Sequence, residues 1–268
     1  MRGIARRVLI SLAPAFCLIL AGEALAGPCK SPDNVTRVTG GSECLVIHTF
    51  GAAAGNRTLV VFIHGDGTRG GPSDYLDKSA ERVAGGGVTA VALIRPGYYD
   101  SHDAISTGTS YRHAGDGYRD GIIASVAAAI DELKDHHGAK RVVLVGHSGG
   151  SAISGVILGR YPGLADAAVL AACPCNIGKW RAMRGRGQWV NSLSPHAFVK
   201  AVPKNTEVVA LTGSRDSNTR PELARDYVSA LNRRGITAIF VEVVGAGHSK
   251  IARTEAFDGA IARLAGRH

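Results

Sequence analysis

The stretch Val142-Val143-Leu144-Val145-Gly146-His147-Ser148-Gly149-Gly150 decides how this chain folds. Its aliphatic residues predict a buried strand, and residues 148–160 that follow have the pattern of a helix. A serine between glycines at such a junction matches G-x-S-x-G, in which small residues let the chain turn sharply. The hydroxyl then projects above the sheet at the amino end of a helix, where developing negative charge is favoured. We therefore predict that Ser148 is a nucleophile rather than part of an ordinary loop.

Apolar runs and helical patterns alternate along the chain after residue 45. Continuous apolar strands that alternate with helices indicate a mostly parallel central sheet with helices on both faces. The predicted strands are 45–49, 58–63, 88–94, 142–145, 167–171, 207–212 and 238–243. The predicted helices are 73–84, 115–137, 148–160, 220–234 and 253–264. Residues 176–195 are poorly periodic, and we interpret them as a short cap insertion.

A serine nucleophile needs a base, and the base needs a carboxylate that orients it. His248 follows the last predicted strand, and Asp216 follows the strand before it. Both are therefore expected at the carboxyl ends of parallel strands, on the same edge of the sheet as Ser148. Asp226 is a weaker candidate for the carboxylate because it lies inside a predicted helix. The alternatives are a loop histidine bonded to backbone and an aspartate that merely stabilises a turn.

Two backbone N–H groups are needed to bind the oxyanion of an acyl-transfer reaction. Gly149, the residue after the nucleophile, is predicted to supply one of them. The other is expected from the loop after the strand 58–63, with Asp66 as the first choice and Gly67 as the second. The alternative for this loop is a plain turn, which Asp-Gly favours in any case.

Several short motifs together resemble the α/β-hydrolase superfamily, over nearly all of the residues after 26. They are His64-Gly65-Asp66-Gly67, Arg95-Pro96-Gly97-Tyr98, Gly146-His147-Ser148-Gly149-Gly150, Gly213-Ser214-Arg215-Asp216 and Gly245-Ala246-Gly247-His248. The part from Ser194-Pro195 to His248 is most similar to prolyl-oligopeptidase-like and dienelactone-hydrolase-like members. The Arg-Pro-Gly-Tyr motif is more similar to the esterase and proline-iminopeptidase branch. The resemblance implies the α/β-hydrolase fold, with its triad in the chain order Ser, Asp, His.

Aromatic and histidine side chains crowd the loop after the third predicted strand, among them Tyr98, Tyr99 and His102. They are candidates for lining the substrate site, because aromatic rings can stack on an acyl or aromatic group. A packed surface loop is an equal alternative. Trp180 in the insertion is a further candidate for the pocket, with a core position as its alternative. The predicted mechanism needs no metal and no cofactor.

The first 26 residues have the pattern of a secretory signal peptide, with arginines, an apolar run and the cleavage site Ala24-Leu25-Ala26. Residues 27–268 are then expected to be a single exported domain, periplasmic or secreted, without a stable membrane anchor. Sec and twin-arginine export both remain open.

Of the chain's five cysteines, Cys17 lies in the predicted signal. The other four suit disulfides in an exported chain. Cys29 with Cys44 is the preferred pair. A bridge between Cys173 and Cys175 would be strained, so these two are candidates to stay reduced. Metal or redox chemistry at Cys-Pro-Cys is the minor alternative, since no second cysteine pair lies nearby in the sequence.

The formal net charge of the chain is +9, spread along it with a small cluster at Lys179, Arg181, Arg184 and Arg186. Nucleic-acid binding usually needs a denser stripe or a recognisable motif, so we expect no nucleic-acid partner. The basic residues are interpreted as a solvated face, with attraction of anionic substrates or envelope surfaces as the functional alternative.

The favoured hypothesis is an exported serine hydrolase that cleaves carboxylic esters through an acyl-enzyme on Ser148. A small serine peptidase with the same triad, of aminopeptidase or prolyl-peptidase type, is the alternative. A binding protein on the same scaffold is less favoured, because it would need no nucleophile. The natural substrate and the oligomeric state are left open by the sequence.

Overall fold

A computed structural model describes residues 29–53, 55, 57–68, 70–113 and 115–266. Its centre is one eight-stranded sheet, with strand order β1-β2-β4-β3-β5-β6-β7-β8. The two pairings β1–β2 and β2–β4 are antiparallel, and all others are parallel. The strands are β1 (Arg37–Gly40), β2 (Glu43–Phe50), β3 (Thr58–Ile63), β4 (Val88–Leu93), β5 (Arg141–His147), β6 (Ala167–Ala171), β7 (Glu207–Gly213) and β8 (Thr237–Val243).

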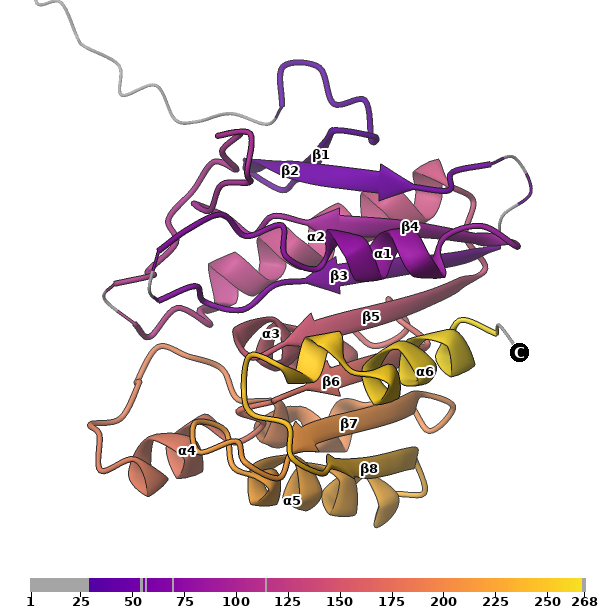
Figure 1. The fold of residues 1–268 in the computed structure, drawn as a ribbon. Helices are drawn as coiled ribbons and strands as arrows, with labels where there is room; N and C mark the ends of the chain where they lie inside the picture. Colours follow the sequence, from indigo (N-terminus) through magenta and orange to yellow (C-terminus); the bar gives the residue numbers. More distant parts are fainter. Residues whose placement is uncertain (1–28, 54, 56, 69, 114, 267–268) are drawn as a thin grey trace, which may run out of the picture.

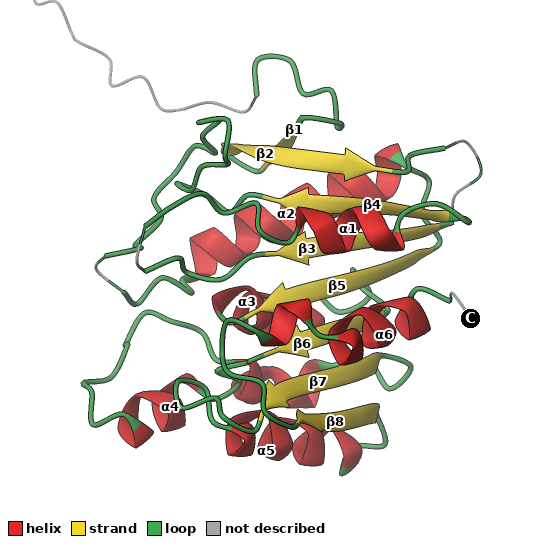
Figure 2. Ribbon diagram, in the orientation of Figure 1, coloured by secondary structure: helices red, strands yellow, loops and turns green. Residues whose placement is uncertain are grey.

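Helices cover both faces of this sheet, as continuous apolar strands require (Figures 1 and 2). One core cluster joins the sheet to α2 (Asp120–His136), α3 (Gly149–Arg160) and α5 (Pro221–Asn232). The opposite cluster joins it to α1 (Asp77–Val83) and α6 (Glu255–Leu264). Successive side chains of β5 alternate between the two clusters, with Leu144 in the first and Val145 in the second.

The predicted fold class is confirmed, and every predicted strand and helix is present, with changes at the ends. The helix expected from residue 73 begins at Asp77, and the one expected from residue 115 begins at Asp120. The antiparallel strand β1 was not predicted, because its four residues are too short a run to stand out. The insertion is more regular than its sequence indicates, since it contains the helix α4 (Ile177–Met183) and leads into the 3-10 helix η1 (Pro195–Ala201).

All four described cysteines are paired. Cys29 is bonded to Cys44 across 15 residues, which is the predicted pair. Cys173 is bonded to Cys175, which differs from the expectation that these two stay reduced. The loop after β6 turns sharply at Ala172, whose φ is 51°, and brings the two Cα atoms to 5.0 Å. That separation lies in the ordinary range for a disulfide, which the sequence spacing alone did not reveal.

The predicted signal peptide lies outside the described residues. Within them, no helix is long and apolar enough to cross a membrane.

Candidate active site

Ser148 stands at a sharp turn between β5 and α3. Its backbone has φ 53° and ψ −117°, a left-handed conformation that costs energy for any residue with a side chain. The flanking glycines are required by close contacts. A Cβ at Gly146 would lie 2.5 Å from Ser151, and one at Gly150 would lie 1.9 Å from the carbonyl oxygen of Ile63. Glycine is therefore required at positions 146 and 150 of the predicted turn, because any side chain there would overlap the neighbouring backbone.

His248 links Ser148 to Asp216, as the sequence predicts for the three residues. Nε2 of His248 lies 2.9 Å from Oγ of Ser148, and Nδ1 lies 2.8 Å from Oδ2 of Asp216. These three residues come from the loops after β5, β7 and β8, which end at one edge of the sheet. In this geometry the serine hydroxyl donates to the histidine, and the histidine N–H donates to the carboxylate. The third candidate, Asp226, instead forms an exposed ion pair with Lys179 on the outer side of α5.

Asp216 is almost fully buried, with its side chain at 0% exposure. Burial by itself would raise the pKa of this carboxyl, but hydrogen bonds from His248 and Thr219 lower it below its usual value. The backbone N–H groups of Asn218 and Thr219 both donate to Oδ1, and the Thr219 hydroxyl donates to Oδ2. The carboxylate is thus held ionised and in one orientation toward the histidine.

Asn218 also approaches the histidine from the side of the serine. Its side-chain Nδ2 lies 3.1 Å from Nε2 of His248, while its Oδ1 is buried without a hydrogen-bond partner in the described chain. This residue follows Asp216 by two positions, and its contact was not predicted.

His147 connects the serine turn to both neighbouring loops. Its Nδ1 accepts the hydroxyl of Tyr75 at 2.7 Å, and its Nε2–H donates to the backbone oxygen of His248 at 3.0 Å. The same Tyr75 oxygen accepts the N–H of Gly65 at 2.7 Å. Burial lowers the pKa of His147 to about 4, so the ring is neutral at physiological pH. One neutral histidine therefore ties together the loops of Gly65, Ser148 and His248.

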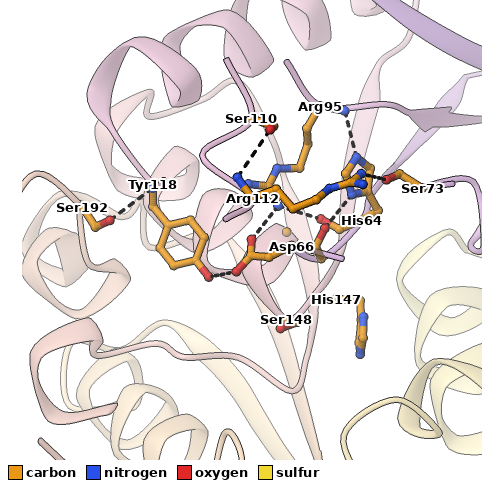
Figure 3. A network of polar contacts seen from close by, with 12 residues as sticks. His64, Asp66, Ser73, Arg95, Ser110, Arg112, Tyr118, His147, Ser148 and Ser192 are labelled. Atoms are coloured by element: carbon orange, nitrogen blue, oxygen red, sulfur yellow. Dashed lines mark hydrogen bonds and ion pairs between the residues drawn. The ribbon is translucent and has the colours of Figure 1, made fainter. Parts of the chain in front are cut away.

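On the other side of Ser148, Asp66 is clamped between a cation and a phenol (Figure 3). Oδ1 accepts from Arg95 at 3.0 Å, and Oδ2 accepts from the hydroxyl of Tyr118 at 2.6 Å. The Arg95 side chain is only 2% exposed and also donates to the carbonyl of His64 at 3.2 Å. Burial would lower the pKa of this guanidinium, but the charge of Asp66 and the phenol of Tyr98 raise it instead. The Arg95 guanidinium thus stays charged beside the carboxyl group of Asp66.

The two N–H groups predicted to bind an oxyanion belong to residues that lie against each other. A Cβ at Gly149 would lie 2.1 Å from Oδ1 of Asp66, so the carboxylate packs on this glycine. Gly65 closes the same corner, since a Cβ there would lie 3.1 Å from Cβ of Ser148. Neither the N–H of Asp66 nor that of Gly149 has an acceptor among the described residues. Both donors are therefore free next to the serine.

A cavity of about 330 Å³ opens beside Asp66. It extends away from the serine toward the insertion, and Ser148 and His248 are not among the residues that line it. Aromatic rings and arginines make up much of its wall. They are Arg95, Tyr98, Tyr111, Arg112, Tyr118, Arg181, Arg186 and Trp189.

The residues expected to line a substrate site divide between the cavity, the core and the surface. Tyr98 lines the cavity, whereas Tyr99 is half-buried beside it. His102 is exposed on a turn, where its N–H donates to Asp100, so it lines none of the described pockets. Trp180 is a core residue whose indole N–H donates to the backbone of Asn218, and the neighbouring Trp189 faces the cavity instead. Side chains of one loop can point to opposite sides of it, so the sequence did not show which of these rings line the cavity.

Several residues of this region were not assigned a role from the sequence. Arg95 belongs to a motif that was quoted, but its partner Asp66 is 29 positions away. Tyr118 and Thr219 carried no signal that separates them from ordinary tyrosines and threonines. His147 could have been found, because a histidine next to the nucleophile must lie near the other loops at this edge. Among the described residues, no three metal-ligating side chains form a cluster that could hold an ion.

The mostly parallel sheet, the strained serine after a strand and the histidine and aspartate on later loops define the α/β-hydrolase fold. The chain has this fold, and the resemblance seen in its motifs is confirmed. A family model described as "alpha/beta hydrolase fold" matches residues 58–183, which include Asp66 and Ser148.

Solved structures of esterases and of a peptidase are similar to this chain. An esterase of Thermogutta terrifontis has a TM-score of 0.65 at 18% identity, with 87% of this chain and 94% of the esterase covered. An esterase of Pyrococcus furiosus has a TM-score of 0.63 at 14% identity, with 85% and 87% covered. The acylaminoacyl peptidase of Pyrococcus horikoshii has a TM-score of 0.68 at 15% identity. The match covers 87% of this chain but only 41% of the peptidase. At such identities the likeness shows a common fold. Among curated proteins, none matches the sequence significantly.

Proposed function

We propose that this protein is a serine hydrolase that cleaves carboxylic esters through an acyl-enzyme on Ser148. The observation that carries the proposal is the unbroken chain of contacts from the Ser148 hydroxyl through His248 to Asp216, at 2.9 Å and 2.8 Å. A strained serine in contact with a base, and a base in contact with a buried carboxylate, is the arrangement that activates a hydroxyl for attack on a carbonyl. The esterases among the structural neighbours support the same reaction class.

In the first half of the reaction, Oγ of Ser148 attacks the ester carbonyl while Nε2 of His248 takes the hydroxyl proton. Asp216 holds the imidazole in the tautomer that leaves Nε2 free and stabilises the imidazolium that forms. The tetrahedral oxyanion is bound by the N–H groups of Gly149 and Asp66, which have no acceptor among the described residues. When this intermediate collapses, the C–O bond to the alcohol breaks and His248 returns its proton to the leaving oxygen.

In the second half, a water molecule replaces the serine as the nucleophile. His248 removes one proton from the water as its oxygen attacks the acyl carbon, and the same N–H groups bind the second oxyanion. Collapse releases the carboxylic acid and gives the proton back to Oγ of Ser148. Every proton transfer uses Nε2 of His248, so no cofactor takes part in the proposed cycle.

A fluorophosphonate probe followed by mass spectrometry tests the nucleophile. We expect labelling of the wild type at Ser148 and none in Ser148→Ala. Labelling that persists in the alanine variant would refute this assignment. Circular dichroism of both proteins shows whether the variant is folded.

A panel of nitrophenyl esters and aminoacyl nitroanilides shows whether the protein cleaves esters or amides. The same triad serves both reactions, and a peptidase is among the structural neighbours, so amide cleavage is the alternative. An aminopeptidase would need a free carboxylate to bind the substrate amine, but Asp66 is already paired with Arg95 and Tyr118. We expect hydrolysis of short or aromatic esters and little of aminoacyl amides. An amide kcat/KM equal to or above that of the matched ester would favour the peptidase.

Export is proposed from the amino-terminal pattern and is supported by the two disulfides in the described chain. The mature protein recovered from the cell envelope or medium is expected to begin near Gly27. Amino-terminal sequencing of that material tests this, and an uncleaved cytoplasmic form would contradict it.

A further inference from the structure

The cavity beside Asp66 is lined by more positive charge than the protein itself neutralises. Of its four arginines, Arg95 is paired with Asp66. The other three have no carboxylate within salt-bridge distance in the part of the chain that the structure describes, and they are Arg112, Arg181 and Arg186. A concave site that gathers unpaired guanidinium groups attracts an anion.

Arg112 is held by several neighbouring residues, and Figure 3 shows its side chain next to Ser73. Its guanidinium carbon lies 4.8 Å from the ring centre of Tyr98 and 5.2 Å from that of Tyr99, so the group contacts two aromatic rings. The hydroxyl of Ser73 accepts from Nη2 at the long distance of 3.5 Å. The Nε–H is buried and has no hydrogen-bond partner in the described chain. A positioned guanidinium with a buried, unused donor is suited to a ligand that supplies the acceptor.

Arg181 and Arg186 reach the same cavity from the insertion. The guanidinium of Arg181 lies 4.7 Å from the ring centre of Trp189, and that ring packs edge-on against Tyr118. Partial burial and the neighbouring charges of Arg186 and Arg184 lower the pKa of Arg181, so like charges are held together here. These two arginines are part of the basic cluster seen in the sequence.

The acidic groups at this cavity do not cancel that charge. Asp66 accepts from both Arg95 and Tyr118, which uses its two oxygens. Asp116 accepts from the backbone and side chain of Asn191, and these bonds hold the insertion to the loop before α2. The cavity therefore keeps a net positive charge beside the serine.

The cavity lies next to the reacting centre, from which Asp66 and Tyr118 separate it. Asp66 and Tyr118 both line it, and both pack against Gly149, where a Cβ would lie 2.1 Å from Oδ1 of the one and 2.9 Å from Cε1 of the other. A group in the cavity is thus separated from Gly149 by the thickness of one side chain, and the proposed ester reaches Ser148 past Asp66 and Tyr118.

We propose that the preferred substrate is an ester that carries a carboxylate, bound in this cavity by Arg112 and Arg181 among aromatic side chains. The inference rests on the proposed esterase function. A planar guanidinium pairs with a carboxylate through two hydrogen bonds, and a volume of about 330 Å³ holds an arm the size of a benzene ring. The carboxylate belongs to either the acyl or the alcohol part of the ester, and the experiment separates the two.

Two pairs of rigid substrates test the proposal, and the members of each pair match in size and shape but differ in charge. On the acyl side, the 4-nitrophenyl ester of terephthalic acid is compared with that of 4-carbamoylbenzoic acid. On the alcohol side, 4-acetoxybenzoate is compared with 4-acetoxybenzamide. Because the carboxylate is para to the reacting group, it cannot attack its own ester. We expect a kcat/KM roughly tenfold or more higher for the anion in one of the pairs, carried mainly by KM.

Arg112→Gln and Arg181→Gln are each expected to reduce this preference to about threefold or less. The preference is the ratio of kcat/KM for the two substrates of a pair in one variant, so a loss common to both substrates cancels. Arg184→Gln is the matched control, because the substitution removes the same charge. Arg184 itself is exposed and does not line the cavity. This variant should retain the preference. Higher salt should weaken the preference of the wild type.

The outcomes distinguish this proposal from the function on which it rests. If neutral esters are hydrolysed through Ser148 but neither anionic ester is preferred, the esterase function stands and the carboxylate site is refuted. An equal loss of preference in Arg184→Gln would also refute it, since the effect would then be general attraction. If no ester is hydrolysed, the esterase function fails, and terephthalate binding followed by calorimetry still tests the site. Binding that Arg112→Gln and Arg181→Gln weaken, each shown to be folded by circular dichroism, would support it, and no binding to the wild type would refute it.

Discussion

Two aspartates flank Ser148, and each is held by hydrogen bonds, yet their partners differ. Asp216 contacts His248, which can gain and lose a proton. Asp66 contacts Arg95, which stays charged, and Tyr118, whose pKa burial raises well above its usual value. A carboxylate on a titratable partner can assist proton transfer, whereas one on a permanent cation can only hold structure and charge in place. The partner, rather than the aspartate, determines which task the residue can perform.

The largest expected effect comes from neutralising the two aspartates in turn. Asp216→Asn should lower kcat for a nitrophenyl ester about 10⁴-fold, since the amide favours the wrong tautomer of His248. Asp66→Asn should lower it only about tenfold, because the amide oxygen can still accept one hydrogen bond from Arg95 or Tyr118. Steady-state kinetics of the two variants and the wild type measure this difference. Equal losses would show that the two sides of Ser148 do not have separate roles.

The second expected effect concerns stability on the Asp66 side. Arg95→Gln leaves a half-buried carboxylate without its cation, and the free energy of unfolding should fall by about 3–5 kcal/mol. Urea unfolding followed by tryptophan fluorescence measures it. The double variant Arg95→Gln with Asp66→Asn should recover part of the loss, because the uncompensated charge is then gone. If Asp66→Asn lowers the free energy of unfolding of the Arg95→Gln variant by as much as it lowers that of the wild type, the two residues are not coupled.

A third site extends the comparison to a histidine between two carboxylates. Nδ1 of His48 lies 2.6 Å from Asp77 and Nε2 lies 2.9 Å from Asp100, away from Ser148. The hydrogen bond with Asp77 contributes most to raising the pKa of His48 to about 9. Since the folded-state pKa lies above the unfolded value near 6.5, the stabilisation is complete below pH 6.5 and is lost as the pH rises through 9.

We therefore expect the free energy of unfolding of the wild type to fall by about 1–3 kcal/mol between pH 6.5 and pH 9.5 from this residue, because solvent screens part of the interaction. His48→Gln should be less stable at pH 6.5 and should lack that part of the pH dependence. Urea unfolding at several pH values measures both proteins. If the free energy of unfolding falls equally with rising pH in the wild type and in His48→Gln, other groups are responsible for the pH dependence.

The smallest expected effect tests how the two sides are joined. His147→Phe removes the contacts to Tyr75 and to the backbone of His248, so it should lower kcat about tenfold with little change in KM, through misplaced loops. His147→Gln retains a hydrogen-bond donor, so its kcat should lie between that of His147→Phe and that of the wild type. Because the pKa of His147 is about 4, its ionisation should add no step to the pH profile of kcat above pH 5. A change confined to KM would contradict a positioning role.

The local elements of this protein could be predicted because each depends on residues close together in the chain. The strand β3 and the strand β6 have the predicted bounds, since uninterrupted apolar runs leave little choice. The turn at Ser148 follows from its neighbouring glycines. The placing of His248 and Asp216 at the same edge as Ser148 follows from the rule that parallel strands end together.

What the tertiary structure alone decided is which distant side chains meet. Asp66 was expected to offer an N–H, but that its carboxylate pairs with Arg95 and Tyr118 depends on the order of β3, β4 and β5 in the sheet. In the same way, Arg112 and Arg181 line one cavity although 69 positions separate them. Secondary structure arises from contacts within a few residues, so a sequence determines it locally. Ion pairs and cavities arise from side chains that folding brings together, and their partners cannot be identified until the strand order and loop paths are known.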